Sequence, residues 1–105
     1  MSDASPDTAF ATLPLAPALI DNLASLGFAA MTPIQAEGLP PILAGRDVIA
    51  RAKTGSGKTA AFGLGLLSRL DPASFRVQGL ILCPTRELAD QVAGELRRLA
   101  RTLPN

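Results

Sequence analysis

The sequence predicts an α/β fold, in which helices cover both faces of a parallel sheet. Two short strands are expected at 47–52 and 78–83, and each is followed by a helix, in the order of right-handed βαβ crossovers. The second strand is apolar throughout its centre, as strands of parallel sheets usually are. Of the 105 residues, 48% are apolar, which is enough for a core; with four Phe and neither Trp nor Tyr, that core should be aliphatic.

Two helices should precede the first strand. Apolar residues at helical spacing predict one over 17–26, and Gly27 stands where a C-cap glycine ends a helix. Thr32 is the expected N-cap of the second helix, whose first residue is a proline. We expect this second helix to be short, because Gly38 and the prolines at 40–41 interrupt it.

Two longer helices should follow the strands. The helix expected over 58–70 is apolar around most of its circumference, so it should be buried on more than one side. Gly63 and Gly65 inside it cost about 1 kcal/mol each relative to Ala, which close packing against a neighbour would justify. Residues 86–101 predict an amphipathic helix whose last turns are basic, as the helix dipole favours.

Charge is unevenly divided along the chain. Residues 1–45 hold four acids and no Lys or Arg, whereas residues 46–105 hold all ten bases and five acids. A basic half suits a polyanionic partner, although solvated surface charge is the commoner cause. Cys83 is the one cysteine and His is absent, so we expect no internal disulfide and no zinc site. The first residues, MSDASPDT, have neither a basic start nor an apolar run, and no apolar stretch reaches about 18 residues. We therefore expect no signal peptide and a cytoplasmic protein without a membrane partner.

A glycine-rich turn lies between the first strand and its helix. It reads AKTGSGKT from Ala52 to Thr59, which nearly fits the phosphate-cradling pattern G-x-x-x-x-G-K-[ST], with Ala52 in place of the first glycine. Gly55 and Gly57 let the backbone approach an anion closely. Lys58 adds positive charge for the β- and γ-phosphates, and the Thr59 hydroxyl can bind Mg²⁺. The pattern therefore favours a nucleoside triphosphate site over an ordinary glycine-rich turn.

The same turn has a second interpretation. Residues 55–60 also match the dinucleotide fingerprint G-x-G-x-x-[GA], which requires an acidic residue at the end of the second strand. Here Cys83 is instead followed by Pro84, Thr85 and Arg86. Arg86 would suit a 2′-phosphate, so an NADP site stays open on this pattern, but that site leaves the Gly-Lys-Thr triplet unexplained.

Two further motifs flank the turn. In GFAAMTPIQ, Thr32 and Gln35 are spaced as a capping box, which by itself would explain both residues. In PTRELA, Thr85 is an expected N-cap, whereas Arg86 places a cation in a first helical turn, against the helix dipole. A docked anion would justify Arg86, which with Thr85 and the neighbouring N–H groups resembles a phosphate clamp.

The order GFAAMTPIQ, AKTGSGKT, PTRELA resembles the DEAD-box RNA helicases, and the resemblance runs from Phe10 to the end of the chain. That family tolerates alanine at the position of Ala52. Within the family, FGLGLL and LCPTRELADQVAGELRRLA are most similar to the bacterial DbpA type, which is directed to rRNA. The resemblance implies a P-loop NTPase with a RecA-like parallel sheet, of which the chain holds two βα units preceded by short helices.

The resemblance also implies ATP and Mg²⁺ as cofactors, RNA as a partner, and a role for each motif residue. The ATP-binding residues would be Phe10, Gln35, Ala52, Lys53, Thr54, Gly55, Ser56, Gly57, Lys58 and Thr59. Gln35 would read adenine, with Phe10 packed nearby. Lys58 would be catalytic, and Thr59 would hold Mg²⁺ through ATP. The residues that touch the RNA sugar-phosphate backbone would be Pro84, Thr85 and Arg86.

The implied organisation has three parts: a disordered tail at 1–8, an adenine-recognition segment (Q motif) at 9–37, and the N-terminal part of the first RecA-like domain at 38–105. The implied function is ATP-dependent unwinding of RNA duplexes, in rRNA and ribosome assembly; a non-helicase P-loop nucleotide-binding module is the alternative. The sequence holds no Asp-Glu-Ala-Asp segment, so we expect the 105 residues alone to be inactive. Two strands make a poor sheet, so we expect them to lie apart or to be exposed and mobile.

Overall fold

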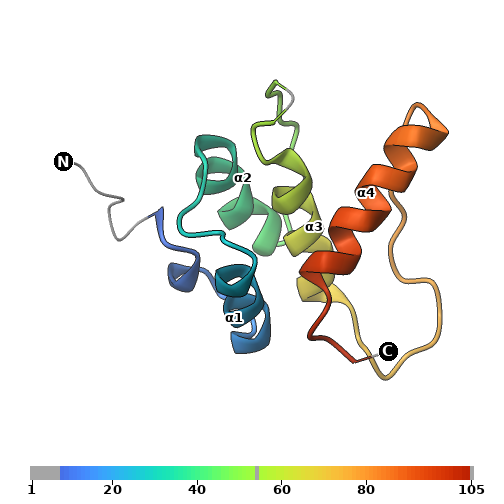
Figure 1. The fold of residues 1–105 in the computed structure, drawn as a ribbon, viewed down its shortest axis with the longest axis horizontal. Coiled ribbons are helices and arrows are strands. Elements are labelled where there is room, and N and C mark those ends of the chain that lie inside the picture. The colour runs from blue at the N-terminus through green and yellow to red at the C-terminus, as the bar shows by residue number, and fades with distance from the viewer. Residues whose placement is uncertain (1–7, 54, 105) are drawn as a thin grey trace.

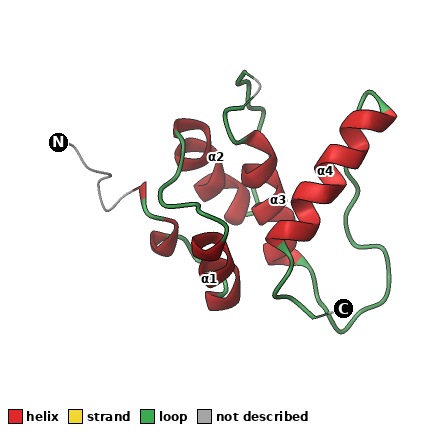
Figure 2. Cartoon of the chain, viewed as in Figure 1, coloured by secondary structure: helices red, strands yellow, loops and turns green. Residues whose placement is uncertain are grey.

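The computed structural model describes residues 8–53 and 55–104, and its regular structure is helical (Figures 1 and 2). The elements are the 3₁₀ turn η2 (Phe10–Thr12) and the helices α1 (Pro17–Ser25), α2 (Pro33–Leu43), α3 (Lys58–Arg69) and α4 (Arg86–Leu99). The bounds of α1, α3 and α4 confirm the sequence prediction to within two residues. Within the described ranges, none of the helices combines the length and apolar character needed to cross a bilayer.

Residues 1–7 of the predicted tail lie outside the described residues. Thr8, the last residue of that tail, accepts a hydrogen bond at 2.7 Å from the backbone N–H of Met31. The chain is therefore tied to the rest of the fold from residue 8 onward.

Helix α3 lies in the middle of the molecule, between α2 and α4, and packs on both (Figure 1). Its two glycines admit the neighbouring side chains. Ile42 of α2 occupies the space that a Cβ at Gly65 would need, and Leu96 and Leu99 of α4 lie against Gly63. The predicted burial of this helix on more than one side is confirmed, and the close neighbours are side chains from two different helices.

The core is small and mostly leucine. The buried hydrophobic residues are Phe10, Leu13, Leu15, Leu19, Leu23, Met31, Leu39, Ala60, Ala61, Leu64, Leu67 and Leu99. The prediction of an aliphatic core is confirmed for all of these except Phe10 and Met31. The core joins the four helices, and it leaves out the valines and isoleucines of the two predicted strands.

Helix α2 is longer than the sequence predicts. It continues through Gly38, Pro40 and Pro41 and ends at Leu43, so the expected interruption is wrong. A proline lacks the N–H that would bond to the carbonyl four residues earlier, yet its own carbonyl still accepts. The Pro40 carbonyl accepts from the N–H of Ala44 at 3.0 Å, so the last turn closes without the missing donors.

The two segments predicted as strands, 47–52 and 78–83, carry no strand in the structure and run as irregular chain (Figure 2). Most of their apolar side chains face solvent: Ile49 is 98% and Leu82 84% exposed. A parallel strand needs hydrogen-bonded neighbours, and no segment of the described chain pairs with either one. The expectation that these segments would be exposed is confirmed.

Candidate nucleotide-binding site

The glycine-rich turn forms a tight loop at the start of α3. Gly55 and Gly57 have φ values of 85° and 93°, a left-handed conformation that favours glycine. The N–H of Ser56 donates to the Lys53 carbonyl at 3.2 Å and closes the turn. Gly57 is the N-cap residue of α3 and brings no side chain to the helix end. The N–H groups of the first helical turn have no partner within the helix, and with the helix dipole they attract an anion.

Lys58, the first residue of α3, reaches back to the start of the loop. Its ammonium nitrogen Nζ donates a hydrogen bond at 2.6 Å to the backbone carbonyl of Ala52. Both residues are half-buried. The contact uses only the backbone of Ala52, so alanine serves here as well as glycine would. The loop therefore holds a full positive charge next to the unpaired N–H groups of α3.

Gln35 joins the start of α2 to this loop. Its side chain is 1% exposed, and its Oε1 accepts a hydrogen bond at 2.9 Å from the N–H of Thr32. Its Nε2 donates at 3.1 Å to the carbonyl of Gly57. The capping role of Gln35 is thus confirmed, and the contact with the loop is a second role that the local pattern of residues does not contain.

The remaining residues of the phosphate loop differ in exposure. Lys53 is exposed and Thr59 is half-buried, whereas Thr54 lies outside the described residues. The Ser56 hydroxyl oxygen is buried without a hydrogen-bond partner in the described part of the chain. An unpaired hydroxyl, an ammonium group and free helical N–H groups together fit a phosphate-bearing ligand, and the Thr59 hydroxyl is of the hard oxygen type that Mg²⁺ prefers.

Phe10 lies in the core and is 4% exposed. Its ring meets the ring of Phe28 edge to face, with centroids 6.0 Å apart and an interplanar angle of 87°. This arrangement is favourable for an aromatic pair. Phe10 therefore anchors the segment that precedes α2, and little of its ring surface is left for another partner.

The predicted RNA-contacting residues lie at the other end of the candidate site. The Thr85 hydroxyl accepts a hydrogen bond at 3.2 Å from the N–H of Leu88, which confirms Thr85 as the N-cap of α4. Pro84 and Arg86 are exposed, and Arg86 is the first residue of the helix. The positively charged guanidinium of Arg86 is thus exposed at the N-terminal end of α4.

A groove of about 860 Å³ connects the phosphate loop with the motif PTRELA. Lys58 and Thr59 line it from the phosphate loop, Pro84 and Leu88 line it from PTRELA, and Cys83 lines it just before that motif. Gln35, Phe10 and Arg86 lie outside it. The structure thus brings part of each motif to one surface of the molecule, next to the exposed strand segments.

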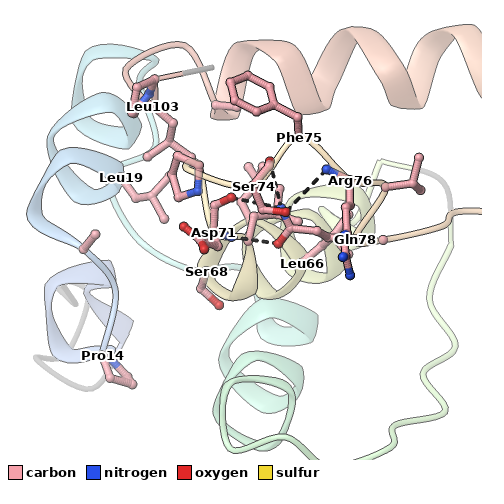
Figure 3. Close-up of a pocket in the computed structure, with 18 residues that line it drawn as sticks. Pro14, Leu19, Leu66, Ser68, Asp71, Ser74, Phe75, Arg76, Gln78 and Leu103 are labelled. Carbon is pink, nitrogen blue, oxygen red and sulfur yellow. Dashed lines mark hydrogen bonds between the residues drawn. The ribbon is translucent and has the colours of Figure 1, made fainter.

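A second pocket, of about 640 Å³, is lined by none of the predicted site residues (Figure 3). It lies between the buried Leu19, the half-buried Leu66 and the loop that follows α3. The Gln78 side chain holds that loop closed, accepting from the N–H of Asp71 at 2.8 Å and donating to the Asp71 carbonyl at 2.9 Å.

One buried polar residue was not found from the sequence. Asn22 is 1% exposed and lies on the apolar face of α1, between Leu19 and Leu23. Its amide contacts the end of α4. A polar residue inside an apolar helical stripe is the signal that could have identified it, because a buried amide requires hydrogen-bond partners.

Comparisons with known proteins agree with this geometry. The family model of the DEAD/DEAH box helicases matches residues 32–104. The ATP-dependent RNA helicase DbpA of Escherichia coli K12 is 69% identical over 93% of this chain and 22% of its own length. The DEAD-box ATP-dependent RNA helicase CshA of Bacillus cereus is 49% identical over 90% of this chain and 18% of its own. The chain thus spans about a fifth of the length of these relatives.

Solved structures are similar in fold. A DEAD box protein from Methanococcus jannaschii superposes with a TM-score of 0.87 at 35% identity, over 93% of this chain and 27% of that one. The S. cerevisiae protein Dbp5, bound to RNA and ADP BeF3, gives a TM-score of 0.86 at 35% identity, over 90% of this chain and 25% of its own. These similarities confirm the predicted α/β fold class of RecA-like type, although the described residues form no strand.

Proposed function

Because this chain belongs to the DEAD/DEAH box helicase family, we propose that it supplies the ATP-binding part of an ATP-dependent RNA helicase. Residues 9–37 form the adenine-recognition segment, and residues 38–105 begin the first RecA-like domain. The observation that carries this proposal is the hydrogen bond from Gln35 to the Gly57 carbonyl, which joins the two segments at the phosphate loop. A base bound by the first segment then lies next to phosphates held by the second.

Adenine recognition falls to the Gln35 amide. After its contacts with Thr32 and Gly57, the amide keeps one N–H and one oxygen lone pair. One donor and one acceptor are what a bidentate contact with adenine requires. Phe10 supports this site from the core through its packing on Phe28. The proposal thus gives Gln35 two structural contacts and one binding role at the same time.

Phosphate binding falls to the loop and the start of α3. Lys58 exchanges the Ala52 carbonyl for oxygens of the β- and γ-phosphates, whose full negative charges attract an ammonium more strongly than a carbonyl dipole does. The N–H groups of the first turn of α3 would donate to the phosphates. Mg²⁺, held through ATP by the Thr59 hydroxyl, would neutralise the charge that develops during phosphoryl transfer.

RNA binding falls to the start of α4. Pro84 and Thr85 present the backbone and Arg86 the charge, so we propose contacts to sugar and phosphate without reading of the sequence. On the strength of the likeness to DbpA, we propose rRNA as the target, ribosome assembly as the process and the cytoplasm as the location.

Calorimetric titration tests the proposal. The chain should bind MgATP, the Lys58→Ala variant should not, and single-stranded RNA should change the nucleotide affinity unless Arg86 is replaced by Ala. A nucleotide affinity indifferent to RNA and to Arg86 would favour a non-helicase P-loop module instead. We expect no phosphate release from ATP by these 105 residues, with or without RNA. Robust turnover that Lys58→Ala abolishes would contradict that expectation.

A further inference from the structure

The amide of Asn22 holds the C-terminal end of α4. Its Nδ2 donates hydrogen bonds to the carbonyls of Arg98 at 2.8 Å and Leu99 at 3.0 Å. The last carbonyls of a helix have no partner within the helix, so a buried one needs a hydrogen-bond donor from elsewhere in the fold. Asn22, at 1% exposed, supplies the partner of the buried Leu99 carbonyl from a different helix, whereas the Arg98 carbonyl also accepts from the Arg101 N–H at 3.4 Å. It therefore fixes the position of the α4 end relative to α1.

Weaker contacts surround this one at the surface. The Ser25 hydroxyl donates to the Asn22 carbonyl at 2.8 Å and accepts from the Arg101 guanidinium at 3.0 Å. The Thr102 hydroxyl donates to the Ala18 carbonyl at 3.1 Å. Ser25, Arg101 and Thr102 are exposed, so water can replace these hydrogen bonds. The Asn22 amide is the buried member of the group.

The packing of α4 is uneven along its length. Residues 86–91 are exposed, and burial begins at Val92 and is complete at Leu99. In Figure 1 the N-terminal end of α4 stands clear of the other helices. The C-terminal half, by contrast, packs on Gly63 of α3 and contacts α1. The direction of α4 is consequently determined at the end that Asn22 holds.

We infer that Asn22 is a positioning residue, which sets the direction of α4 and so places Thr85 and Arg86 for contact with RNA. The inference rests on the proposed function for the role of these two residues. A helix of 14 residues is about 20 Å long, so a rotation of about 5° at one end moves the other by about 2 Å. That displacement exceeds the range of about 0.5 Å over which an N–H···O hydrogen bond stays favourable.

The test uses the 105-residue chain with the variants Asn22→Leu, which removes the donor and keeps the branching and the number of side-chain heavy atoms, and Ser25→Ala as a matched control in the same group. Residual dipolar couplings of ¹⁵N-labelled protein report the direction of α4 relative to α1, α2 and α3. Affinity is measured for a fluorescein-labelled single-stranded RNA decamer at low salt and, separately, for MgATP.

We expect Asn22→Leu to change the couplings of α4 and to lower RNA affinity about fivefold, the loss that one weakened charge-assisted phosphate contact produces. MgATP affinity should stay within twofold of the parent chain, and Ser25→Ala should leave all three readouts unchanged. A general loss of structure would instead lower both affinities together. If Asn22→Leu does not fold, Asn22→Ser, whose shorter side chain avoids overpacking and withdraws the donor, is measured in the same way and should show an effect of the same kind.

The outcomes separate this inference from the proposed function. If Arg86→Ala lowers RNA affinity while the Asn22 variant does not, the positioning role is wrong and the RNA site stands. If the parent chain binds RNA equally well with and without Arg86, the proposed RNA site fails and the inference with it. Unchanged couplings of α4, or an equal loss of both affinities, would also overturn the positioning role.

Discussion

The ammonium group of Lys58 donates a hydrogen bond at 2.6 Å to the carbonyl of Ala52, across the phosphate loop. The first and the seventh residue of AKTGSGKT are thus in direct contact, and the Lys58 ammonium group is bound to the backbone of its own loop. A ligand that binds Lys58 must attract the ammonium group more strongly than the neutral carbonyl does. Phosphate oxygens do so because they are negatively charged. The relationship also explains why alanine is acceptable at position 52, since the backbone makes the contact.

Replacement of Lys58 by Met tests the binding role of this cation. The variant keeps the apolar stem and loses the charge, so MgATP affinity should fall at least about tenfold, as loss of a charged hydrogen bond of about 1.5–3 kcal/mol implies. Isothermal titration calorimetry measures the affinity. Arg97→Met, at an exposed position on α4, is the matched control and should bind as the parent does. Equal affinity of Lys58→Met and the parent would contradict the role of Lys58.

Two variants of Gln35 separate its capping role from its contact with the loop. Gln35→Ala removes both and should lower the free energy of unfolding by about 1 kcal/mol, besides weakening the preference for ATP over GTP. Gln35→Glu keeps the acceptor for the Thr32 N–H but places a carboxylate against the Gly57 carbonyl. Competition binding of ATP and GTP should show the preference lost in both. If Gln35→Glu keeps it, the amide N–H is not needed for adenine.

The two loop glycines should differ in their tolerance of alanine. At Gly55 an added Cβ would meet nothing within 4 Å, so only the left-handed conformation opposes it, at a cost of about 1–2 kcal/mol. At Gly57 a Cβ would overlap the amide nitrogen of Gln35. That amide cannot move aside easily, because hydrogen bonds already hold both its oxygen and its nitrogen. Gly57→Ala should therefore destabilise more and weaken MgATP binding more, as urea unfolding and calorimetry would show. Equal effects of the two variants would count against the Gln35 contact.

A second pair of glycines tests the packing of α3 on α4. In Gly94→Ala the added Cβ has no neighbour within 4 Å, so the gain in helix propensity should stabilise the chain by about 1 kcal/mol. Gly63→Ala would place a Cβ 2.8 Å from Cδ2 of Leu96, so overpacking of about 1–3 kcal/mol should cancel or outweigh that gain. Thermal melting followed by circular dichroism gives both values. A stabilised Gly63→Ala variant would show that α4 packs less closely than described.

The exposed strand segments should promote self-association. Ile49 and Leu82, 98% and 84% exposed, lie on two segments with unpaired backbone groups. The double variant Ile49→Lys/Leu82→Lys should lower the associated fraction in sedimentation velocity and leave the melting temperature unchanged. Ala73→Lys, at another exposed position, is the control for added charge. A large drop in melting temperature of the double variant would mean that these side chains are buried.

Local patterns in the sequence predicted much of the fold. Helical periodicity, the capping threonine Thr85 and Gly27 at the end of α1 identify α1, α3 and α4 to within two residues, because these signals depend on neighbours in the chain. Proline content predicted a break in α2 that the structure does not have, because both prolines fall near its C-terminal end, where the Pro40 carbonyl still accepts a hydrogen bond from the Ala44 N–H. The strand segments were identified by composition, but strands form only when partners pair with them.

The sequence by itself determined the family, the phosphate loop and the two flanking motifs, since these are set by residue type at fixed spacing. Only the tertiary structure decided that Gln35 bonds to the loop, that Phe10 lies in the core and that Asn22 holds the end of α4. Gln35 and Gly57 are 22 residues apart, and Asn22 and Leu99 are 77 apart. Contacts at such separations depend on how helices pack, and no local pattern of residue types contains that information.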